Sequence, residues 1–409
     1  MGRRCLDRAL TMCAALLCAL LFALFAPFPL AAATEEDPLL GVREGWAWPV
    51  VVVPPPDGWD TPGGESVKYG MRAAEREVSL QRGAIRGREV TFMFANLVSA
   101  DELPRRLETW RAMGVAVVVS FGDGAMNEAL RSRCAERGPA VVFAGGEDLS
   151  LLAPATASPH TYLFALDLPY HARANAIAEA ARAEVLEAPS AKAAVISDIY
   201  SRRLAGGASW NVDVLRGKGI DTLYLTIAGL RQDQYLPQVR EAEADGVRFI
   251  ASWLDAMATL SIWRATTLRP GGATVCYAGN AHPVLLDADG LLVVDKDVLL
   301  ERDESGKHAI MIKVRDLFNR VVDEPVLSAK AYALGTWTIQ AYRGAASADA
   351  ASLAARLADA GEIPLMGESL SIDPATHRPV SRKFGVLRVG GREYRSAGSV
   401  EVFSREVRE

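Results

Sequence analysis

The feature that most constrains the fold is a regular alternation of short β-branched runs with segments of helical apolar spacing. Half of the 409 residues are apolar and 23% are charged, which is the composition of a globular protein. The first strand-like runs are 48–53, 89–95, 115–120, 139–144 and 161–169, and helical patterns cover 65–79, 101–113 and 125–137. Alternation of this kind predicts parallel βαβ units with helices on both faces of a doubly wound sheet.

A second series follows a loop at 153–159 that is rich in alanine, proline, serine and threonine. Its strand-like runs are 192–198, 221–227, 247–253 and 273–279, and its helical patterns are 170–186, 203–217 and 235–245. Helical patterns return at 309–322, 329–343 and 348–360 before extended pieces and a hairpin, whereas 287–307 fits no clear element. The fold class predicted is therefore α/β, with two doubly wound parallel-sheet lobes.

Residues 1–33 have the pattern of an export signal. A basic start, "MGRRCLDR", precedes an apolar run and then "PFPLAAA", which ends in the Ala-x-Ala pattern that signal peptidase recognises. The alternative is an uncleaved membrane anchor, because the apolar run approaches the lower length limit of a membrane span. Pro27, Pro29 and the alanines favour cleavage, which would leave a periplasmic protein that begins near Thr34.

The charge and the cysteines bound the class of the mature chain. Loss of Arg3, Arg4, Arg8 and Asp7 with the signal changes the net charge from −5 to −7, and no basic stripe remains, so we expect no nucleic-acid partner. Cys134 and Cys276 are then the remaining cysteines. They are either two buried thiols, which we favour for a chain that can build a large core, or one disulfide.

The turn "SFGDG" at 120–124 does not fit the familiar phosphate-binding motifs. A dinucleotide fingerprint belongs at the first βα turn, whereas this turn is the third, and Asp123 puts a carboxylate where a pyrophosphate would lie. The sequence contains no Walker-type loop and no G-x-S-x-G elbow, and its five histidines are scattered without metal-ligand spacing. We therefore expect no cofactor, no metal site and no catalytic residue, and the pattern favours binding over catalysis.

Polar and aromatic residues gather in the turns after the predicted strands. Because open α/β folds bind ligands at the carboxyl ends of their strands, these turns are the candidate ligand site. The candidates from the first sheet are Asp57, Trp59, Ser120, Gly122, Asp123, Gly124, Gly145 and Gly146; those from the second are Tyr170, Asp198, Tyr200, Trp253 and Asp255. Backbone N–H groups, acids and aromatic rings together suit a small zwitterion. The competing interpretation of each residue is a helix cap or a solvent-facing turn.

The order of these elements resembles the type I periplasmic solute-binding proteins of ABC importers, in the branch of the leucine/isoleucine/valine-binding proteins. Five stretches carry the resemblance: "GGESVKYGMRAAEREVSLQRGAIRGREVTFMFAN", "MGVAVVVSFGDG", "HTYLFALDLPY", "AKAYALGTWTIQAYRGAASADAASLAARLADA" and "LSIDPATHRPVSRKFGVLRVGG". The resemblance covers nearly all of residues 46–405. It implies two lobes with a ligand cleft between them, joined by three crossings near 166–169, 279–283 and 365–368. Lobe I would hold 46–166 and 280–366, and lobe II would hold 167–279 and 367–409.

The resemblance also implies roles for some of the turn residues. A Ser or Thr pair that grips a ligand carboxylate in the family matches the turns at Ser120–Gly124 and Gly145–Gly146, although Asp123 and Glu147 depart from the family pattern. Tyr170 matches a ligand-facing position, and Asp255 lies near the acid that holds an ammonium group. We expect Asp123 either to cap its helix, with Ser120 facing the cleft, or to take the positive group of the ligand itself.

Three functions compete at this point. The resemblance implies a monomeric solute-binding protein that passes a small polar solute, an amino acid or a related amide or carboxylate, to the permease subunits of an ABC importer. The alternatives are a periplasmic sensor or accessory protein of the same fold and a secreted enzyme.

Overall fold

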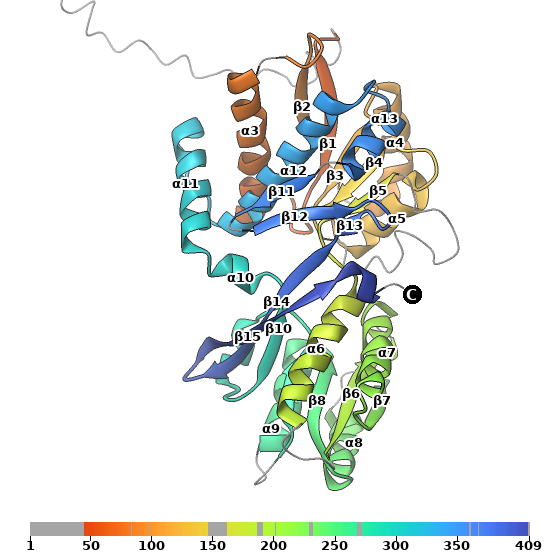
Figure 1. Cartoon of the computed structure of the whole chain (residues 1–409), viewed down its shortest axis with the longest axis vertical. Helices are drawn as coiled ribbons and strands as arrows, with labels where there is room; N and C mark the ends of the chain where they lie inside the picture. Colours follow the sequence, from red (N-terminus) through yellow and green to blue (C-terminus); the bar gives the residue numbers. More distant parts are fainter. Residues whose placement is uncertain are drawn as a thin grey trace, which may run out of the picture.

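The computed structural model describes residues 45–82, 84–97, 99–145, 162–185, 191–200, 202–228, 232–267, 272–359, 361–366 and 368–407. The chain forms two α/β lobes stacked along the long axis of the molecule (Figure 1). The predicted signal segment lies outside the described residues. Within them, no helix is long and apolar enough to cross a membrane.

The sheet of the first lobe consists of parallel strands in the order β2-β1-β3-β4-β5. Their bounds are β1 Ala47–Val53, β2 Glu89–Phe94, β3 Val117–Ser120, β4 Ala140–Phe143 and β5 Leu163–Ala165. Val50 and Val52 of β1 pack in one core cluster, and Val51 and Val53 pack in another. Since successive side chains of a strand point to opposite faces, the continuous valine run is buried because both faces of the sheet are covered.

Helices from distant parts of the chain cover these two faces. One face packs against α3 (Pro62–Arg82) and α12 (Pro325–Gly344), and the other against α4 (Leu103–Ala112, preceded by the short η1, Ala100–Glu102) and α5 (Gly124–Cys134). Helices α3 and α12 approach closely at Gly70, where a Cβ would lie only 2.2 Å from the Ser328 carbonyl oxygen. Helices α11 (Glu304–Phe318) and α13 (Ala350–Ala358) complete this lobe, and a three-stranded sheet of β11 (Glu362–Leu365), β12 (Glu368–Asp373) and β13 (Arg378–Pro379) lies beside them.

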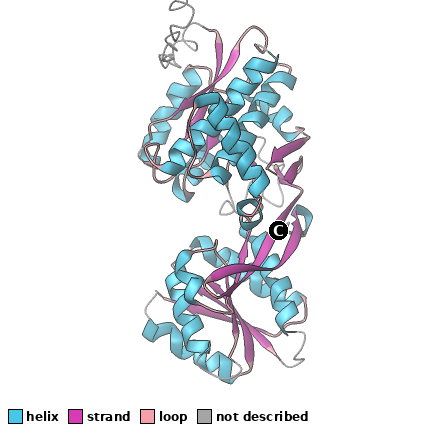
Figure 2. Ribbon diagram, turned by 90° about the vertical axis from the view of Figure 1, so that its left-hand side faces the viewer, coloured by secondary structure: helices cyan, strands magenta, loops and turns pink. Residues whose placement is uncertain are grey.

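The second lobe repeats the design around a sheet of order β15-β14-β10-β9-β8-β6-β7. Its parallel strands are β6 Lys192–Asp198, β7 Thr222–Ile227, β8 Val247–Trp253, β9 Thr274–Tyr277 and β10 Leu292–Asp295. The hairpin of β14 (Ser381–Gly390) and β15 (Glu393–Phe403) adds antiparallel strands at one edge and is followed by η3 (Ser404–Val407). The helices are α6 Tyr170–Val185, α7 Arg202–Gly217, α8 Gln232–Ala244 and α9 Ala256–Thr267, with η2 (Pro283–Asp287) and α10 (Val298–Glu301) near β10. Figure 2 shows helices on both sides of this sheet.

The chain passes between the lobes three times, and two of the passages differ in position from the expected crossings. The first lies between β5 and α6. Beyond Gly279–Pro283 the chain makes one more strand of the second sheet, because β10 pairs with β9, so the second passage lies at 296–297. Strand β12 pairs with β11 of the first lobe, and the third passage therefore lies between β13 and β14, near Val380. Residues 280–295 consequently belong with the second lobe, and 368–379 with the first.

Cys134 and Cys276 are both buried and free. One lies at the end of α5 in the first lobe and the other in β9 of the second. The interpretation as two buried thiols is confirmed.

Candidate functional site

The carboxyl ends of both parallel sheets adjoin the first passage between the lobes. On the first lobe, a Cβ at Gly145, two residues beyond β4, would lie 3.8 Å from Oδ2 of Asp167 in that passage. On the second lobe, the ring of Trp253 at the end of β8 lies 6.1 Å from the ring of Tyr170, which begins α6 directly after the passage. The two sets of turns predicted as a ligand site therefore lie on the sides of the lobes that adjoin the passage.

Trp59 is fixed in the turn after β1. Its Nε1 donates to the Ala95 carbonyl oxygen at 2.7 Å, its ring meets Phe94 edge-on at 5.2 Å, and the Lys68 ammonium lies 5.6 Å from the ring centroid. Asp57, two residues earlier, is exposed. This turn therefore combines an anchored aromatic ring with an exposed carboxylate.

The polar side chains of the turn "SFGDG" make hydrogen bonds within the turn and to the first turn of α5. Ser120 is completely buried, and its hydroxyl lies 2.7 Å from Oδ1 of Asn127 and accepts the N–H of Gly122 at 3.2 Å. Asp123 is the N-cap of α5, since its carboxylate accepts the N–H of Met126 at 2.8 Å. Asp123 thus takes the capping geometry, while Ser120 points into the lobe and does not face the other lobe.

The first turn of α5 still offers donors beside this cap. A Cβ at Gly122 would lie 2.8 Å from Cγ of Met126, so glycine lets the turn fold back over the helix. Among the described residues, the N–H groups of Asp123, Gly124 and Ala125 have no partner. These are the groups that a helix N-terminus presents to an anion. Gly146, the other glycine predicted to lie at this edge, falls outside the described residues.

On the second lobe, an aromatic pair forms the base of the site. Trp253 is only 1% exposed, and its Nε1 donates to Oδ1 of Asn211 at 3.2 Å. Its ring fills the space above Gly207, where a Cβ would lie 2.5 Å from the ring. Tyr170 also crowds this position, since a Cβ at Gly207 would lie 3.0 Å from the Cβ of Tyr170. Trp253 is thus held in the core of the lobe, and the partly buried Tyr170 packs against that core.

The neighbouring turns carry acids and exposed apolar side chains. Strands β6 and β8 pair in register, with Ser197 opposite Trp253, so the turns after them lie side by side. Asp198 accepts the N–H of Tyr200 at 2.9 Å, and exposed Asp255 accepts the N–H of Ala258 at 2.7 Å at the start of α9. Each of these contacts engages one carboxylate oxygen with a backbone N–H. Tyr200 is 73% exposed.

Sequence reasoning missed three residues at this edge. Ile199, in the turn after β6, is 49% exposed, and Met257, in the first turn of α9, is 60% exposed; large apolar side chains are unusual at such exposed positions and could have served as a signal. Tyr277 ends β9, next to β8, and burial raises the pKa of its hydroxyl above the ordinary value, so the hydroxyl stays neutral. The edge can therefore contact both apolar and hydrogen-bonding parts of a ligand.

Within the described residues, no group of His, Cys, Asp and Glu side chains is placed to hold a metal ion. A cavity of about 490 Å³ does occur in the first lobe, between α4 and α5, and it is lined by residues of 104–111 and 131–137. Residues 131–137 of this lining lie at the carboxyl end of α5, the opposite end of that helix from the "SFGDG" turn, and 104–111 belong to α4. The cavity is thus separate from the candidate ligand residues.

Comparison with known proteins identifies the fold. No protein-family model matches the sequence, and no curated protein matches it. Solved structures do match: a leucine-binding protein of Thermotoga maritima has a TM-score of 0.62 at 14% identity, covering 86% of this chain and 98% of that one. An ABC transporter substrate-binding protein of Desulfitobacterium hafniense, in complex with leucine, gives 0.58 at 16% identity, with 86% and 99% covered. A solute-binding protein of an R. palustris ABC transporter, in complex with benzoate, gives 0.56 at 15% identity, with 87% and 98% covered. The chain has the fold of the type I periplasmic binding proteins.

Proposed function

We propose that the protein is an extracytoplasmic solute-binding protein that captures a small polar solute between its two lobes and delivers it to an ABC importer. The observation that carries the proposal is the placement of the two carboxyl edges, which adjoin the same passage and carry exposed polar and apolar side chains. Open α/β sheets bind ligands at such edges. The complexes of similar proteins with leucine and with benzoate support an amino acid or a related small carboxylate or amide.

The turns suggest how such a solute is held. A ligand carboxylate would meet the N–H groups at the start of α5, where the helix dipole favours negative charge. A ligand ammonium would meet Asp198 or Asp255, each of which accepts a backbone N–H through Oδ1 and would turn Oδ2 to the ligand. Tyr200 and Met257 would cover the apolar part.

A thermal-shift screen of the mature chain tests the proposal. The probes are the twenty amino acids, their amides and small carboxylates, including leucine and benzoate. A ligand present at about one hundred times its dissociation constant adds about 2.7 kcal/mol to the free energy of unfolding. If no probe raises the melting temperature, capture of this solute class is refuted.

A matched pair of variants then locates the site. Tyr200→Ala removes an exposed aromatic side chain at the proposed site and should weaken binding of the probe found in the screen. Trp46→Ala removes an aromatic side chain that is 65% exposed and precedes the amino end of β1, away from the carboxyl ends of the strands. Equal affinity of the two variants would exclude the turn after β6 from the site.

Asp123→Asn asks whether the cap also acts on the ligand. Asn caps a helix as well as Asp, so stability should change little. A weaker affinity by about 2–5 kcal/mol would mean that Asp123 pairs with a buried positive group of the ligand. Wild-type affinity would mean that Asp123 serves α5 alone.

Export and delivery are tested separately from binding. Permease and ATPase genes beside the gene for this chain would support import. Their absence would favour the alternative, a periplasmic sensor of the same fold. Turnover of a bound probe would instead favour the secreted enzyme.

A further inference from the structure

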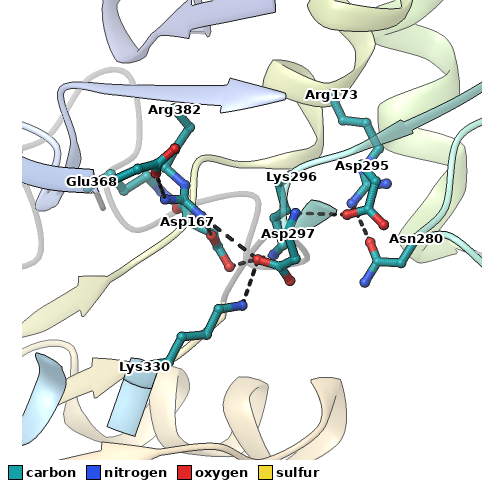
Figure 3. Close-up of polar contacts among 10 residues, drawn as sticks. Asp167, Arg173, Asn280, Asp295, Lys296, Asp297, Lys330, Glu368 and Arg382 are labelled. Atoms are coloured by element: carbon teal, nitrogen blue, oxygen red, sulfur yellow. Dashed lines mark hydrogen bonds and ion pairs between the residues drawn. The ribbon is translucent and has the colours of Figure 1, made fainter. Parts of the chain in front are cut away.

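Each of the three passages between the lobes carries a charged residue into the same buried region. Asp167 lies in the first passage, Lys296 and Asp297 form the second, and Arg382 begins the second-lobe side of the third. Figure 3 shows these side chains converging, together with Lys330 and Glu368 from the first lobe. We call these six residues the passage cluster.

Asp167 links the first passage to both of the others. Its side chain is 2% exposed, with Lys296 Nζ at 2.5 Å from Oδ2 and Arg382 Nη2 at 3.5 Å from Oδ1. The neighbouring ammonium and guanidinium groups hold the pKa of Asp167 below its usual value in spite of burial. The backbone is bound too, because Arg378 Nη1 donates to the Asp167 carbonyl oxygen at 2.5 Å.

Arg382, beside the third passage, contacts carboxylates of the first and second passages and of the first lobe. It is 2% exposed at its side chain, and its Nη2 lies 3.5 Å from Asp167 in the first passage and 3.9 Å from Asp297 in the second. Its Nη1 donates to Glu368 at 3.2 Å, in β12 of the first lobe. One guanidinium group beside the third passage therefore reaches the other two.

The second passage is also fixed to both lobes. Lys330 of α12, in the first lobe, donates to Asp297 at 2.7 Å. On the other side, Asp295 of β10 accepts the N–H of Asp297 at 2.8 Å and that of Ala281 at 2.7 Å. Arg173 of α6 donates to the Val294 carbonyl oxygen at 2.9 Å and to Asn280 at 2.8 Å.

A cluster of this kind is specific for one geometry. Three acids and three bases balance in charge, and Asp167, Lys296 and Arg382 are each less than 10% exposed. A buried charge that loses its partner is strongly unfavourable, whereas an intact pair is tolerated. Since the partners belong to different lobes and passages, a rotation of one lobe against the other would separate them.

We propose that the passage cluster is a conformational restraint that sets the angle between the two lobes, with Arg382 as the residue that couples the three passages. The restraint acts in the protein without ligand. It therefore goes beyond the proposed binding function and does not depend on it.

Distances between spin labels on the two lobes test the restraint. Ser132→Cys in α5 and Asp213→Cys in α7 supply exposed labelling positions in the first and second lobe. The native thiols should stay unlabelled, because burial raises the pKa of Cys134 to about 11 and that of Cys276 to about 12. Pulsed electron paramagnetic resonance then gives the distribution of interlobe distances without any ligand.

The informative variant is Arg382→Met, and Arg388→Met is its matched control. Arg388 lies on the same strand β14 and pairs with Glu184 of α6 within the second lobe, away from the passages. We expect a broader distance distribution with a shifted mean for Arg382→Met and the wild-type distribution for Arg388→Met. A folded Arg382→Met protein with the wild-type distribution overturns the proposal.

Two milder variants keep the test decisive if Arg382→Met does not fold. Lys330→Met removes the first-lobe partner of Asp297, and Glu368→Gln removes the charge that Arg382 meets in β12 of the first lobe. Broader distributions in both support the restraint. Unchanged distributions in both overturn it, because a cluster that only stabilised the fold would alter the melting temperature and leave the interlobe distances as they are.

Discussion

Gly207 and Gly206 of α7 offer a sharp test of how the base of the second-lobe edge is packed. A Cβ at Gly207 would lie 2.5 Å and 2.8 Å from two ring atoms of Trp253 and 3.0 Å from Cβ of Tyr170. A Cβ at Gly206 would meet nothing within 4 Å. The same added methyl group would therefore be crowded at Gly207 and would meet open space at the adjacent Gly206.

The expected difference follows from two opposing effects. Replacing glycine by alanine inside a helix gains about 0.8–1 kcal/mol, and this gain applies at both positions. Gly207→Ala also overpacks the core at a cost of about 1–3 kcal/mol, because Trp253 is buried and held by Asn211. Since the helix-propensity gain cancels between the variants, Gly207→Ala should be less stable than Gly206→Ala by about 1–3 kcal/mol.

Urea unfolding followed by far-UV circular dichroism measures this difference. Gly206→Ala should be more stable than the wild type, and its affinity for a ligand should be unchanged. Gly207→Ala should also shift Tyr170 and Trp253 and so weaken binding. Equal unfolding free energies for the two variants would refute the close packing of α7 on Trp253.

Three further predictions concern protonation and export. Burial raises the pKa of Glu75 to about 7, so the folded protein binds an extra proton between about pH 4.5 and 7 and loses stability as the pH rises through that interval. Unfolding free energies measured from about pH 5 to pH 8 should show this loss in the wild type and not in Glu75→Gln. The pKa values of Asp167 and Asp297 lie below the ordinary value of 3.8 because of their cationic partners, so the stability that these carboxylates contribute is present above that pH and is lost as the pH falls. The free energy of unfolding should therefore fall more steeply with falling pH in the wild type than in Arg382→Met, and equal slopes would contradict this. Amino-terminal sequencing of the exported protein should begin near Thr34, and an intact Met1 in the membrane fraction would show an uncleaved anchor instead.

The sequence predicted the regular elements best where a buried strand has clear ends. Strands β6 and β8 occupy the predicted residues 192–198 and 247–253, because each is a run of apolar residues bounded by charged or turn residues. Helix α9 was missed because it starts only three residues after β8, without a glycine or proline to mark the change.

The positions of the passages could not be read from local patterns. Gly279 and Pro283 resemble the end of a lobe, but β10 follows them and completes the second sheet through a pairing that depends on tertiary structure. The passage cluster shows the same limit, since Asp167 and Arg382 are far apart in sequence. Its one local signal is charge within apolar surroundings, as in "LFALDLP" and "LLVVDKD".

Two strand ends beside the candidate site, those of β6 and β8, were predicted correctly, whereas β5 ends earlier than the predicted residue 169. Tyr170 lies next to Trp253, and the turns after β6 and β8 lie side by side. The directions of individual side chains were not predictable, because they depend on local hydrogen bonds. Ser120, for example, is drawn into the lobe by Asn127.

The interleaved path of the chain has a consequence for the order of synthesis. The face of the first sheet that α3 covers is also covered by α12, and β14 is a strand of the second sheet. Neither lobe is therefore complete until residues beyond 325 have been synthesised. Domains normally fold as units as they leave the ribosome, but here the growing chain holds only incomplete cores until late in translation. Until the residues beyond 325 emerge, the valine-rich strands of the first sheet lack one of their covering helices, which leaves them prone to aggregation during synthesis.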